Sequence, residues 1–504
     1  MQVEPSFEAF AAAYAQGRPQ IVSATLAGDL ETPVSAFMKL AGDRPNAFLL
    51  ESVEGGDTRG RYSMIGLDPD LIWRCDKGVA SINRHPATPE AFEALPGHPL
   101  DTLRALIAES RIELPEGAPP MAAGLFGYLG YDMVRLMERL PAEKPDPIGV
   151  PDAILIRPTV MVVFDAVRDD ITAVTPVRPQ QGVTAKQAYA RAGERLSGIV
   201  DGLDRHTPKL AETVDLDALH ASAVSNTSEA DYLAMVDRAK EYIRAGDVFQ
   251  VVLSQRFTAP FQLPPFALYR ALRRVNPAPF LVYLQFAGFS VVCSSPEILV
   301  RLRDGKVTIR PIAGTRPRGK TREEDRAHEA SLLADPKERA EHLMLLDLGR
   351  NDVGRVSRIG TVNVTDKFFV ERYSHVMHIV SNVEGEIGPG HDALAALAAG
   401  FPAGTVSGAP KVRAMEIIDE LERDKRGLYA GAIGYFGADG QMDTCIVLRT
   451  ALVKDGVMHV QAGAGIVYDS VPASEQAECI NKAKALFRAA EEAVRFAGQP
   501  GRGQ

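Results

Sequence analysis

The sequence predicts a sheet-rich α+β fold in which helices cover antiparallel β-sheets. Three observations support this prediction. Short apolar runs typical of strands recur along the chain, interrupted by stretches with helical character. Two Asp-Gly turns separate apolar strands near the C-terminus. At 504 residues, with 46% hydrophobic and 24% charged residues, the chain has the composition of a soluble globular protein with a large core.

Residues 1–225 are predicted to form an N-terminal region of strands and helices. The strand-like runs cover residues 47–53, 61–67, 70–75, 153–167 and 170–177. A Gly-rich stretch, 122–140, leads into a predicted helix, and a further helix is predicted over 185–203. The composition becomes polar between about 179 and 230, so we place the main boundary near residue 225.

Residues 226–504 form the second predicted region, in which helices and strands alternate. Its clearest pattern lies at 429–467, where the Asp-Gly turns 439–440 and 455–456 separate three apolar strands and predict an antiparallel meander. A helix over 474–496 follows, with Ser474 as its predicted N-cap.

Charge and composition exclude several classes of function. The net charge of −9 argues against nucleic acid as a main partner, because phosphate binding requires clustered positive charge. No stretch of the chain is apolar enough to predict a membrane span, and the N-terminus lacks the pattern of a signal peptide. The 4 cysteines include no CxxC pair. We therefore expect a cytoplasmic protein.

Residues 341–355 (EHLMLLDLGRNDVGR) predict a helix that carries a carboxylate on an apolar face. Leu345 and Leu348 lie four and seven positions after Glu341, so the three side chains share one face. A carboxylate in that position either reaches solvent at the rim of the core or is held there for a purpose.

Three further patterns carry little information on their own. The small-residue loop 404–410 either starts a helix with a serine cap or forms a cradle for an anion. Glu478 and Lys482, four residues apart, are by themselves an exposed ion pair worth about 0.3–0.5 kcal/mol. Gly463 and Gly465 do not complete a dinucleotide fingerprint, and at a strand end they allow another group to approach the backbone.

Together these patterns indicate an enzyme that uses magnesium and acts on a small carboxylate or phosphate. Two carboxylates with few other ligands suit Mg²⁺, which takes its remaining oxygens from water and an anionic substrate. His375 and His378 form an HxxH pair, but no further Cys or His is near enough in the sequence to suggest zinc.

Seven motifs, in this order, resemble the chorismate-utilising enzymes and, within them, component I of the anthranilate synthases. They are PIAGTRPRG, AEHLMLLDLGRNDVGR, RYSHVMHIVSNVEG, GTVSGAPKVRAMEIIDELE, GAIGYFGADGQMDTCIVLRTA, QAGAGIVYDSVP and ECINKAKAL. The resemblance is dense over about 226–490 and extends more loosely to LLES at 49–52. It implies two large antiparallel β-sheets packed against each other with helices on the outside.

The resemblance also implies the reaction, in which chorismate and ammonia give anthranilate and pyruvate, the first step of tryptophan biosynthesis. Glu341 and Glu478 occupy the positions of the Mg²⁺ ligands. Glu297 matches a general acid that protonates the departing hydroxyl group, and burial is expected to raise its pKa. His378 matches the histidine of the later step, the loss of pyruvate. The substrate-contact positions are Gly314, Thr315, Thr405, Tyr429, Arg449, Gly463, Ala464, Gly465 and Lys482.

Two positions distinguish members of this family. Isochorismate-forming relatives carry a water-activating lysine where this sequence has Gln250, so ammonia is the expected nucleophile. Aminodeoxychorismate synthases commonly carry a lysine where this sequence has Ala313, which favours anthranilate over the 4-amino product. Ammonia from glutamine would come from a separate glutamine amidotransferase subunit (component II), in an expected heterotetramer.

The resemblance further implies feedback inhibition by tryptophan. The positions of the inhibitor site are Glu51, Ser52, Pro279, Phe280, Leu281 and Tyr435. Leu281 departs from the methionine of many relatives, which leaves the sensitivity to tryptophan open.

Three alternatives stay open at this stage. The nearest is aminodeoxychorismate synthase component I, which has the same fold. A catalytically silent, tryptophan-sensing subunit would need none of the predicted catalytic residues. A generic Mg²⁺-dependent phosphate enzyme is the third.

Overall fold

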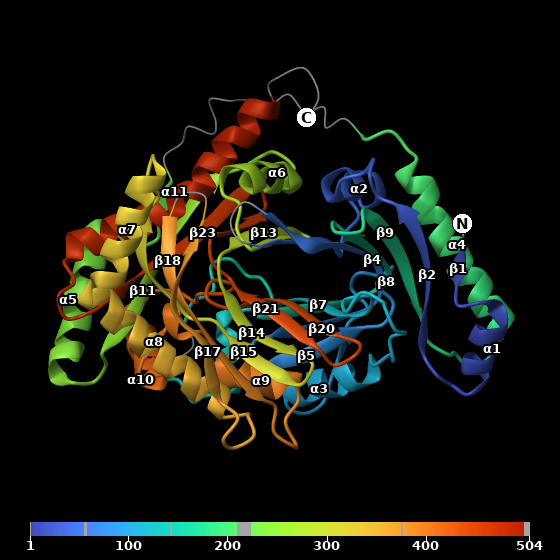
Figure 1. Ribbon diagram of the computed structural model, residues 1–504, viewed down its shortest axis with the longest axis horizontal. Coiled ribbons are helices and arrows are strands. Elements are labelled where there is room, and N and C mark those ends of the chain that lie inside the picture. Colours follow the sequence, from blue (N-terminus) through green and yellow to red (C-terminus); the bar gives the residue numbers. More distant parts are fainter. Residues whose placement is uncertain (1, 55–57, 142–143, 209–222, 374–375, 498–504) are drawn as a thin grey trace.

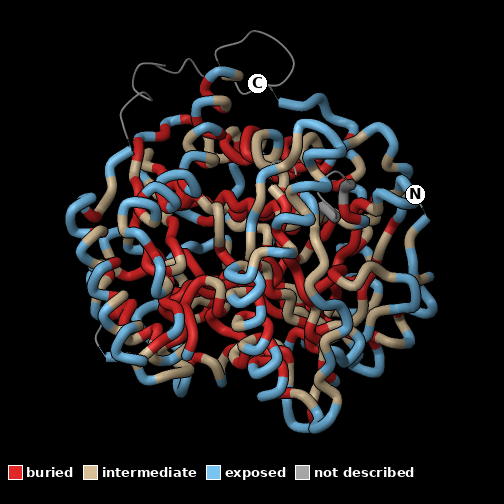
Figure 2. The backbone as a smooth tube through the Cα atoms, turned by 60° about the vertical axis from the view of Figure 1, so that its left-hand side comes forward, coloured by how far each residue is buried: buried red, intermediate tan, exposed pale blue. Residues whose placement is uncertain are grey.

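Two layers of antiparallel strands pack against each other in the computed structural model of the protein, and helices cover their outer faces (Figure 1). The structure describes residues 2–54, 58–141, 144–208, 223–373 and 376–497. Figure 2 shows that buried backbone segments fill the interior and exposed ones surround it.

The first layer contains the strands that neighbour the inhibitor positions. In order across the sheet they are β1 (Val3–Glu4), β2 (Gln20–Ala27), β9 (Asp170–Val177), the C-terminal part of β8 (Ala153–Asp165), the N-terminal part of β4 (Thr58–Asp76), β3 (Ala47–Glu54), β12 (Phe280–Phe286), β13 (Phe289–Ser295), β22 (Thr450–Lys454), β23 (Val457–Ile466) and β11 (Gln250–Pro260), with β10 (Val224–Ser225) and β19 (Gly408–Ala409) beyond β11.

The second layer contains β6 (Glu93–Ala94), β5 (Val79–Asn83), the C-terminal part of β4, the N-terminal part of β8, β7 (Gly124–Leu129), β20 (Ala432–Gly437), β21 (Met442–Ile446), β14 (Ile298–Arg303), β15 (Lys306–Ile309), β18 (Val376–Glu386) and β17 (Asn363–Arg372), with β16 (Ile312–Pro317) on β18 next to β15.

The long strands β4 and β8 run through both layers and join them. β8 pairs along its whole length with residues 62–75 of β4, and the register shifts where Pro69 lies opposite Pro158. Proline has no N–H group to donate to the ladder, so two facing prolines interrupt it and let both strands turn. Asp68, beside this corner, has a left-handed backbone with φ of 49°. The bend carries the same two strands from one layer into the other.

Helices cover each layer from outside. The first layer carries α1 (Phe7–Ala15), α2 (Pro33–Leu40), α4 (Ala185–Leu203), α6 (Pro265–Val275) and α11 (Pro472–Ala497). The second carries α3 (Pro99–Glu109), η1 (Tyr131–Leu136) and α9 (Ala393–Gly400). In Figure 1, α6 and α2 lie above the strands, and α3 and α9 lie below them. The remaining helices pack on strands β11, β16, β18 and β23. They are α5 (Glu229–Ala245), α7 (Arg322–Ala334), α8 (Pro336–Gly354), η3 (Gly404–Val406) and α10 (Lys411–Leu421).

The core between the layers is aromatic. The rings of Phe48 and Phe126 stack with centroids 4.6 Å apart, and Tyr435 continues the stack 5.5 Å from Phe126. These residues come from β3, β7 and β20, so the contact spans the predicted boundary at residue 225. Strands also pair across it, β3 with β12 and β7 with β20. The division into 1–225 and 226–504 stays a prediction.

The α+β class and several predicted elements are confirmed. Strand β3, the pair β8 and β9, and helix α4 lie where the sequence predicts them. The runs 61–67 and 70–75 form one bent strand, β4, instead of two. The Gly-rich stretch forms strand β7, and only the short 3₁₀ helix η1 follows it.

The predicted C-terminal meander is wrong in one respect, and the difference shapes the active site. The Asp-Gly turns do join β20 to β21 and β22 to β23. However, β21 pairs with β14 in the second layer and β22 with β13 in the first. The chain changes layer at Arg449, whose φ is 47°. No glycine or proline marks this break, so the sequence pattern predicts one strand here instead of two.

Two local predictions also need correction. Helix α11 begins at Pro472, two residues before the predicted cap Ser474. Ser407 does not cap α10, which starts after Pro410 without a side-chain cap, and its hydroxyl donates instead to the carbonyl of Ala403. All 4 cysteines are buried free thiols. Within the described ranges, no helix combines the length and apolar composition needed to cross a membrane.

Candidate active site

The predicted catalytic and substrate-binding residues come from strands and helices that meet at one end of the two layers. Glu297 lies between β13 and β14, His378 on β18, and Arg449 between β21 and β22. The charges of Arg449 and Lys482 lower the pKa of both Glu297 and His378. All four side chains therefore lie within electrostatic range of one another.

Glu297 is buried, with 6% of its surface exposed. Burial, which disfavours the charged form, raises the pKa of its carboxyl group to about 8. The hydroxyl of Thr405, on η3, donates to its Oε1 at 3.1 Å and moderates that rise. At neutral pH this side chain is mostly a protonated acid. It can give up a proton.

His378 is neutral and has a defined tautomer. Burial, with a contribution from Arg449, lowers the pKa of its imidazole to about 4. Its Nδ1 lies 3.1 Å from the carbonyl oxygen of Gly314 and 3.0 Å from the hydroxyl of Thr315. A carbonyl oxygen can only accept, so Nδ1 carries the proton and Nε2 is a free base.

Arg449 and Lys482 supply positive charge. Arg449 is held in place through its main chain, whose carbonyl accepts from the N–H of Ser294 at 3.2 Å. Burial lowers the pKa of its guanidinium, which makes an anionic partner more favourable. Lys482, on α11, donates to the carbonyl of Gly463 at 2.9 Å and pairs with Glu478 at 2.7 Å.

The two glycines of β23 leave room for side chains of the site, as the sequence indicates. A Cβ at Gly463 would lie 2.8 Å from the hydroxyl of Tyr429, and one at Gly465 would lie 2.5 Å from the amide nitrogen of Gln250. Ala464, between them, points into the core on the other face. Any side chain larger than hydrogen at 463 or 465 would displace these groups.

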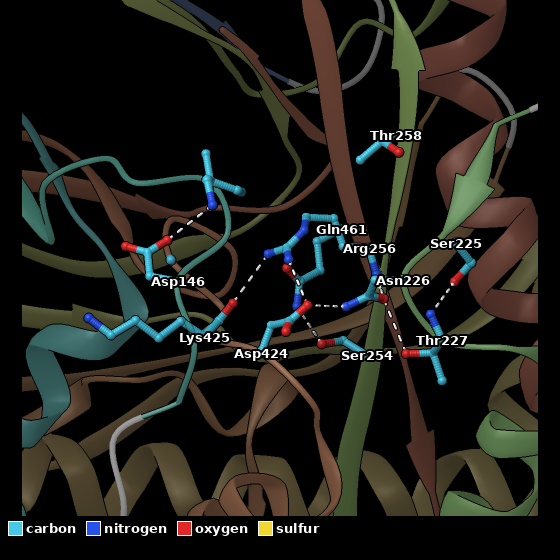
Figure 3. A network of polar contacts seen from close by, with 12 residues as sticks. Asp146, Ser225, Asn226, Thr227, Ser254, Arg256, Thr258, Asp424, Lys425 and Gln461 are labelled. Carbon is cyan, nitrogen blue, oxygen red and sulfur yellow. Dashed lines mark hydrogen bonds and ion pairs between the residues drawn. The ribbon is translucent and has the colours of Figure 1, made fainter.

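A buried polar network lies beside Tyr429, and part of it is shown in Figure 3. Arg256 and Asn226 both donate to Asp424, at 2.9 and 2.8 Å. Glu422 accepts from Ser254 at 2.8 Å and pairs with Arg426 at 2.6 Å. Arg426 also donates to the carbonyls of Val406 and Val252, both at 2.7 Å. The network thereby fixes η3 and the segment that leads to Tyr429.

Glu341 and Glu478, the predicted metal ligands, influence each other from two helices. Burial is the main cause that raises the pKa of Glu341, followed by the negative charges of Glu338 and Glu478. The amide of Gln250 approaches the carboxylate of Glu341 at 3.4 Å. Glu475 has its pKa raised by burial and by Glu478. The carboxylates of α8 and α11 thus influence one another, and that of Glu338 also pairs with Arg316 at 2.9 Å.

The arrangement fits a divalent cation, because a cation relieves the repulsion that raises these pKa values. Among the described residues, no group of three or more His, Cys, Asp and Glu side chains is close enough to hold an ion by itself. Sequence reasoning missed Glu338 and Glu475. The signal was present, since each predicted ligand follows another glutamate by three residues, one helical turn away. His375, of the HxxH pair, lies outside the described residues.

A second site lies on the outer face of the first layer. A cavity of about 400 Å³ is lined by residues that include Glu51, Ser52, Arg273, Pro277 and Leu281. Leu281 lies directly opposite Glu51 in the pairing of β12 with β3. Glu51 pairs with Arg273 of α6 at 2.5 Å through Oε2, while its buried Oε1 has no hydrogen-bond partner among the described residues.

The other predicted inhibitor residues lie differently. Phe280 is opposite Ser52 in the same strand pair, and Pro279 precedes it. Tyr435 does not line this cavity and belongs to the core between the layers. Sequence reasoning missed Arg273, which only the packing of α6 brings to Glu51. The resemblance places residues 276–281 in the second wall of this site, and of these Pro277 and Leu281 line the cavity.

Comparisons with known proteins agree on one family. The family model of the chorismate-binding enzymes matches residues 46–488. Anthranilate synthase component 1 of Cereibacter sphaeroides is 60% identical over 499 residues, covering 99% of this chain and 100% of its own. The crystal structure of anthranilate synthase component I from Streptococcus pneumoniae is 37% identical, with a TM-score of 0.74 over 92% of this chain and 98% of that one. The menaquinone-specific isochorismate synthase of Escherichia coli shares the fold, with a TM-score of 0.70 at 19% identity over 96% of this chain and 99% of that one.

Proposed function

The chain belongs to the chorismate-binding enzymes and, within them, to anthranilate synthase component 1, and from this premise we propose how its residues perform the reaction. The substrates are chorismate and ammonia, and the products are anthranilate, pyruvate and water. One observation carries the assignment of roles. An acid with a pKa of about 8, a neutral histidine and two cations lie within electrostatic range of one another.

The first step adds ammonia to the ring and removes the ring hydroxyl. The nitrogen lone pair forms a bond at C2, the double bonds shift, the C4 hydroxyl leaves, and the added nitrogen then loses one proton, which restores the acid form of Glu297. Glu297 gives its proton to this oxygen, so that water departs instead of hydroxide. Its raised pKa keeps that proton available at neutral pH. Gln250 cannot act as a base toward water, which leaves ammonia as the nucleophile.

The second step makes the ring aromatic. The Nε2 of His378 takes the proton from C2, the ring C–O bond to the enolpyruvyl group breaks, and the leaving group gains a proton to become pyruvate. The Nδ1–H bond to Gly314 orients the ring for this role. Its pKa of about 4 ensures that the base is unprotonated at the start.

Substrate binding uses the cations and the glycine-lined strand. We assign one chorismate carboxylate to Arg449, whose planar donor groups suit such a partner. The cation of Lys482, on α11 beside Gly463 of β23, completes the pocket with Thr405, Thr315 and Tyr429. Gly463, Ala464 and Gly465 let the substrate approach the backbone of this strand.

Glu341 and Glu478 would hold Mg²⁺, with Glu338 and Glu475 able to contact it through water. When bound, the ion would neutralise and orient the ring carboxylate of chorismate. The protein's own contribution is to hold two pairs of carboxylates on neighbouring helices, in part against their mutual repulsion.

The cavity at Glu51 and Ser52 is the proposed tryptophan site. An amino acid carries an ammonium group and a carboxylate. The unpartnered Oε1 of Glu51 would accept from the ammonium group. The volume of the cavity, about 400 Å³, suits a small molecule. Leu281 would supply an apolar wall, as methionine does in many relatives.

The component 1 family name implies a second component. We propose that a glutamine amidotransferase subunit supplies ammonia in a heterotetramer. We place the complex in the cytoplasm, where the 4 buried thiols stay reduced.

The test is an assay of the purified chain with chorismate, Mg²⁺ and ammonium at alkaline pH, read by anthranilate fluorescence and by mass. Anthranilate and pyruvate in equal amounts would support the proposal, and Glu341→Ala should abolish both. A 4-amino product that keeps the enolpyruvyl group would point instead to aminodeoxychorismate synthesis. If no product forms, the chain acts as a silent binding subunit.

A further inference from the structure

Ser294 lies between the inhibitor cavity and the active site. It is fully buried on β13, where it stands directly opposite Leu281 of β12. Leu281 stands in turn opposite Glu51 of β3. Residues opposite each other in antiparallel strands point to the same face, so the three side chains form a row across three neighbouring strands. Glu51 and Leu281 line the cavity.

Ser294 makes two hydrogen bonds that lead in opposite directions. Its hydroxyl donates to the carbonyl of Asn276 at 2.5 Å, and its backbone N–H donates to the carbonyl of Arg449 at 3.2 Å. Asn276 ends helix α6 and precedes Pro277, which lines the cavity. Arg449 has a left-handed backbone, φ 47°, which a non-glycine residue keeps only where its surroundings hold it.

Helix α6 is tied to the cavity at a second point. Arg273, one helical turn before Asn276, forms the ion pair with Glu51 at 2.5 Å. A ligand whose ammonium group binds the free Oε1 of Glu51 brings a second cation to the carboxylate whose Oε2 pairs with Arg273, and so weakens that ion pair. A weaker pair holds the C-terminal turn of α6 less firmly. That turn ends at the carbonyl that Ser294 holds.

We infer that Ser294 is a positioning residue that couples the cavity to Arg449. Occupation of the cavity displaces the end of α6, and Ser294 transmits the displacement to the backbone of Arg449, which then binds the substrate carboxylate less well. This inference rests on the proposed function, in which the cavity binds tryptophan and Arg449 binds chorismate. Since coupling between two sites is reciprocal, tryptophan and chorismate must weaken each other's binding by the same factor.

The test is Ser294→Ala in the full chain, which removes the hydroxyl but keeps the backbone N–H. Ser290→Ala is the matched control, because Ser290 is a buried serine on the same face of β13 whose hydroxyl lies 3.4 Å from that of Tyr283 instead. If the alanine variant does not fold, Ser294→Cys replaces it, because the thiol of cysteine is similar in size to the hydroxyl but is only a weak hydrogen-bond donor. Calorimetry measures the tryptophan Kd with and without chorismate and Mg²⁺, in the absence of ammonia.

In the wild type we expect chorismate to raise the tryptophan Kd at least about fivefold. Ser294→Ala should bind tryptophan within threefold of wild type and keep its uninhibited turnover, while the fivefold effect falls below twofold. Ser290→Ala should keep the effect. Full coupling in Ser294→Ala, or equal loss in both variants, overturns the inference and leaves the proposed function intact. If the wild type binds no tryptophan, both the proposed inhibitor site and this inference are wrong.

Discussion

The hydroxyl of Thr405 donates to the carboxyl group of Glu297 at 3.1 Å, and it is the largest influence that opposes the rise in the pKa of this acid. Burial raises the pKa of Glu297, and this bond from η3 to the segment between β13 and β14 limits the rise.

The first prediction concerns that pH range. Because the pKa of Glu297 is raised to about 8, the acid is protonated below this pH and loses its proton above it. At a constant concentration of neutral ammonia, kcat should fall as the pH rises through about 8. Thr405→Val removes a bond that lowers the pKa, so the fall should move to higher pH. A profile identical to wild type would contradict the role of this bond.

The second prediction is that Glu297→Gln lowers kcat by about 10²–10⁴-fold, the usual contribution of a general acid. Glutamine fills the same volume but has no proton to give. The chorismate KM should stay within threefold of wild type, as measured by anthranilate fluorescence. Asp68→Asn, in an exposed ion pair with Arg44 at 3.1 Å, is the control and should be fully active.

The third prediction separates the two steps. His378→Asn should form the amino-substituted intermediate but release little pyruvate, so mass spectrometry should find a species equal to chorismate plus ammonia minus water. The pKa of His378 is lowered to about 4, so the wild type should show no loss of activity between pH 7 and 5 from this group. His459→Asn is the control, because burial lowers the pKa of this histidine to about 4 as well. Stoichiometric pyruvate from His378→Asn would refute the assignment.

The fourth prediction tests the metal site without relying on activity. Mg²⁺ at 100 times its Kd should stabilise the wild type by about 2.7 kcal/mol, seen as a rise in Tm. Glu341→Gln and Glu478→Gln should lose this rise, and chelation should leave their Tm unchanged. Glu491→Gln, also on α11 but outside the site, should behave like wild type. An unaltered Mg²⁺ response in both variants would show that the ion binds elsewhere.

The fifth prediction concerns the inhibitor cavity. Glu51→Gln should raise the tryptophan Kd at least tenfold, because the neutral amide lacks the negative charge that forms an ion pair with an ammonium group. It also leaves Arg273 without its charged partner, which should lower the free energy of unfolding by about 3 kcal/mol. Calorimetry and denaturant unfolding measure the two effects separately. Tryptophan binding of wild-type strength would exclude Glu51 from the site.

Much of the site was predictable because its signals are local. The spacing of Glu341, Leu345 and Leu348 identifies one helical face, and that helix is α8. The glycines 463 and 465 indicated close approach to a strand end, which the contacts with Tyr429 and Gln250 explain. The motifs supplied the order of the functional residues along the chain.

Other features depend on contacts between distant segments. The pairing of β21 with β14 and of β22 with β13 separates two strands that are adjacent in sequence. No glycine, proline or turn sequence around Arg449 announces this change of layer. Arg273 reaches the cavity at Glu51 only because α6 packs over β12 and β13.

The sequence by itself determined the class of fold, the helix that carries Glu341 and the chemical types of the site residues, since periodicity, turn residues and motif order are properties of neighbouring letters. Only the tertiary structure decided which residues meet and with what charge. The proton on Glu297 is the clearest case. A glutamate is ordinarily ionised at neutral pH, and this one keeps its proton because segments from distant parts of the chain close around it and exclude water.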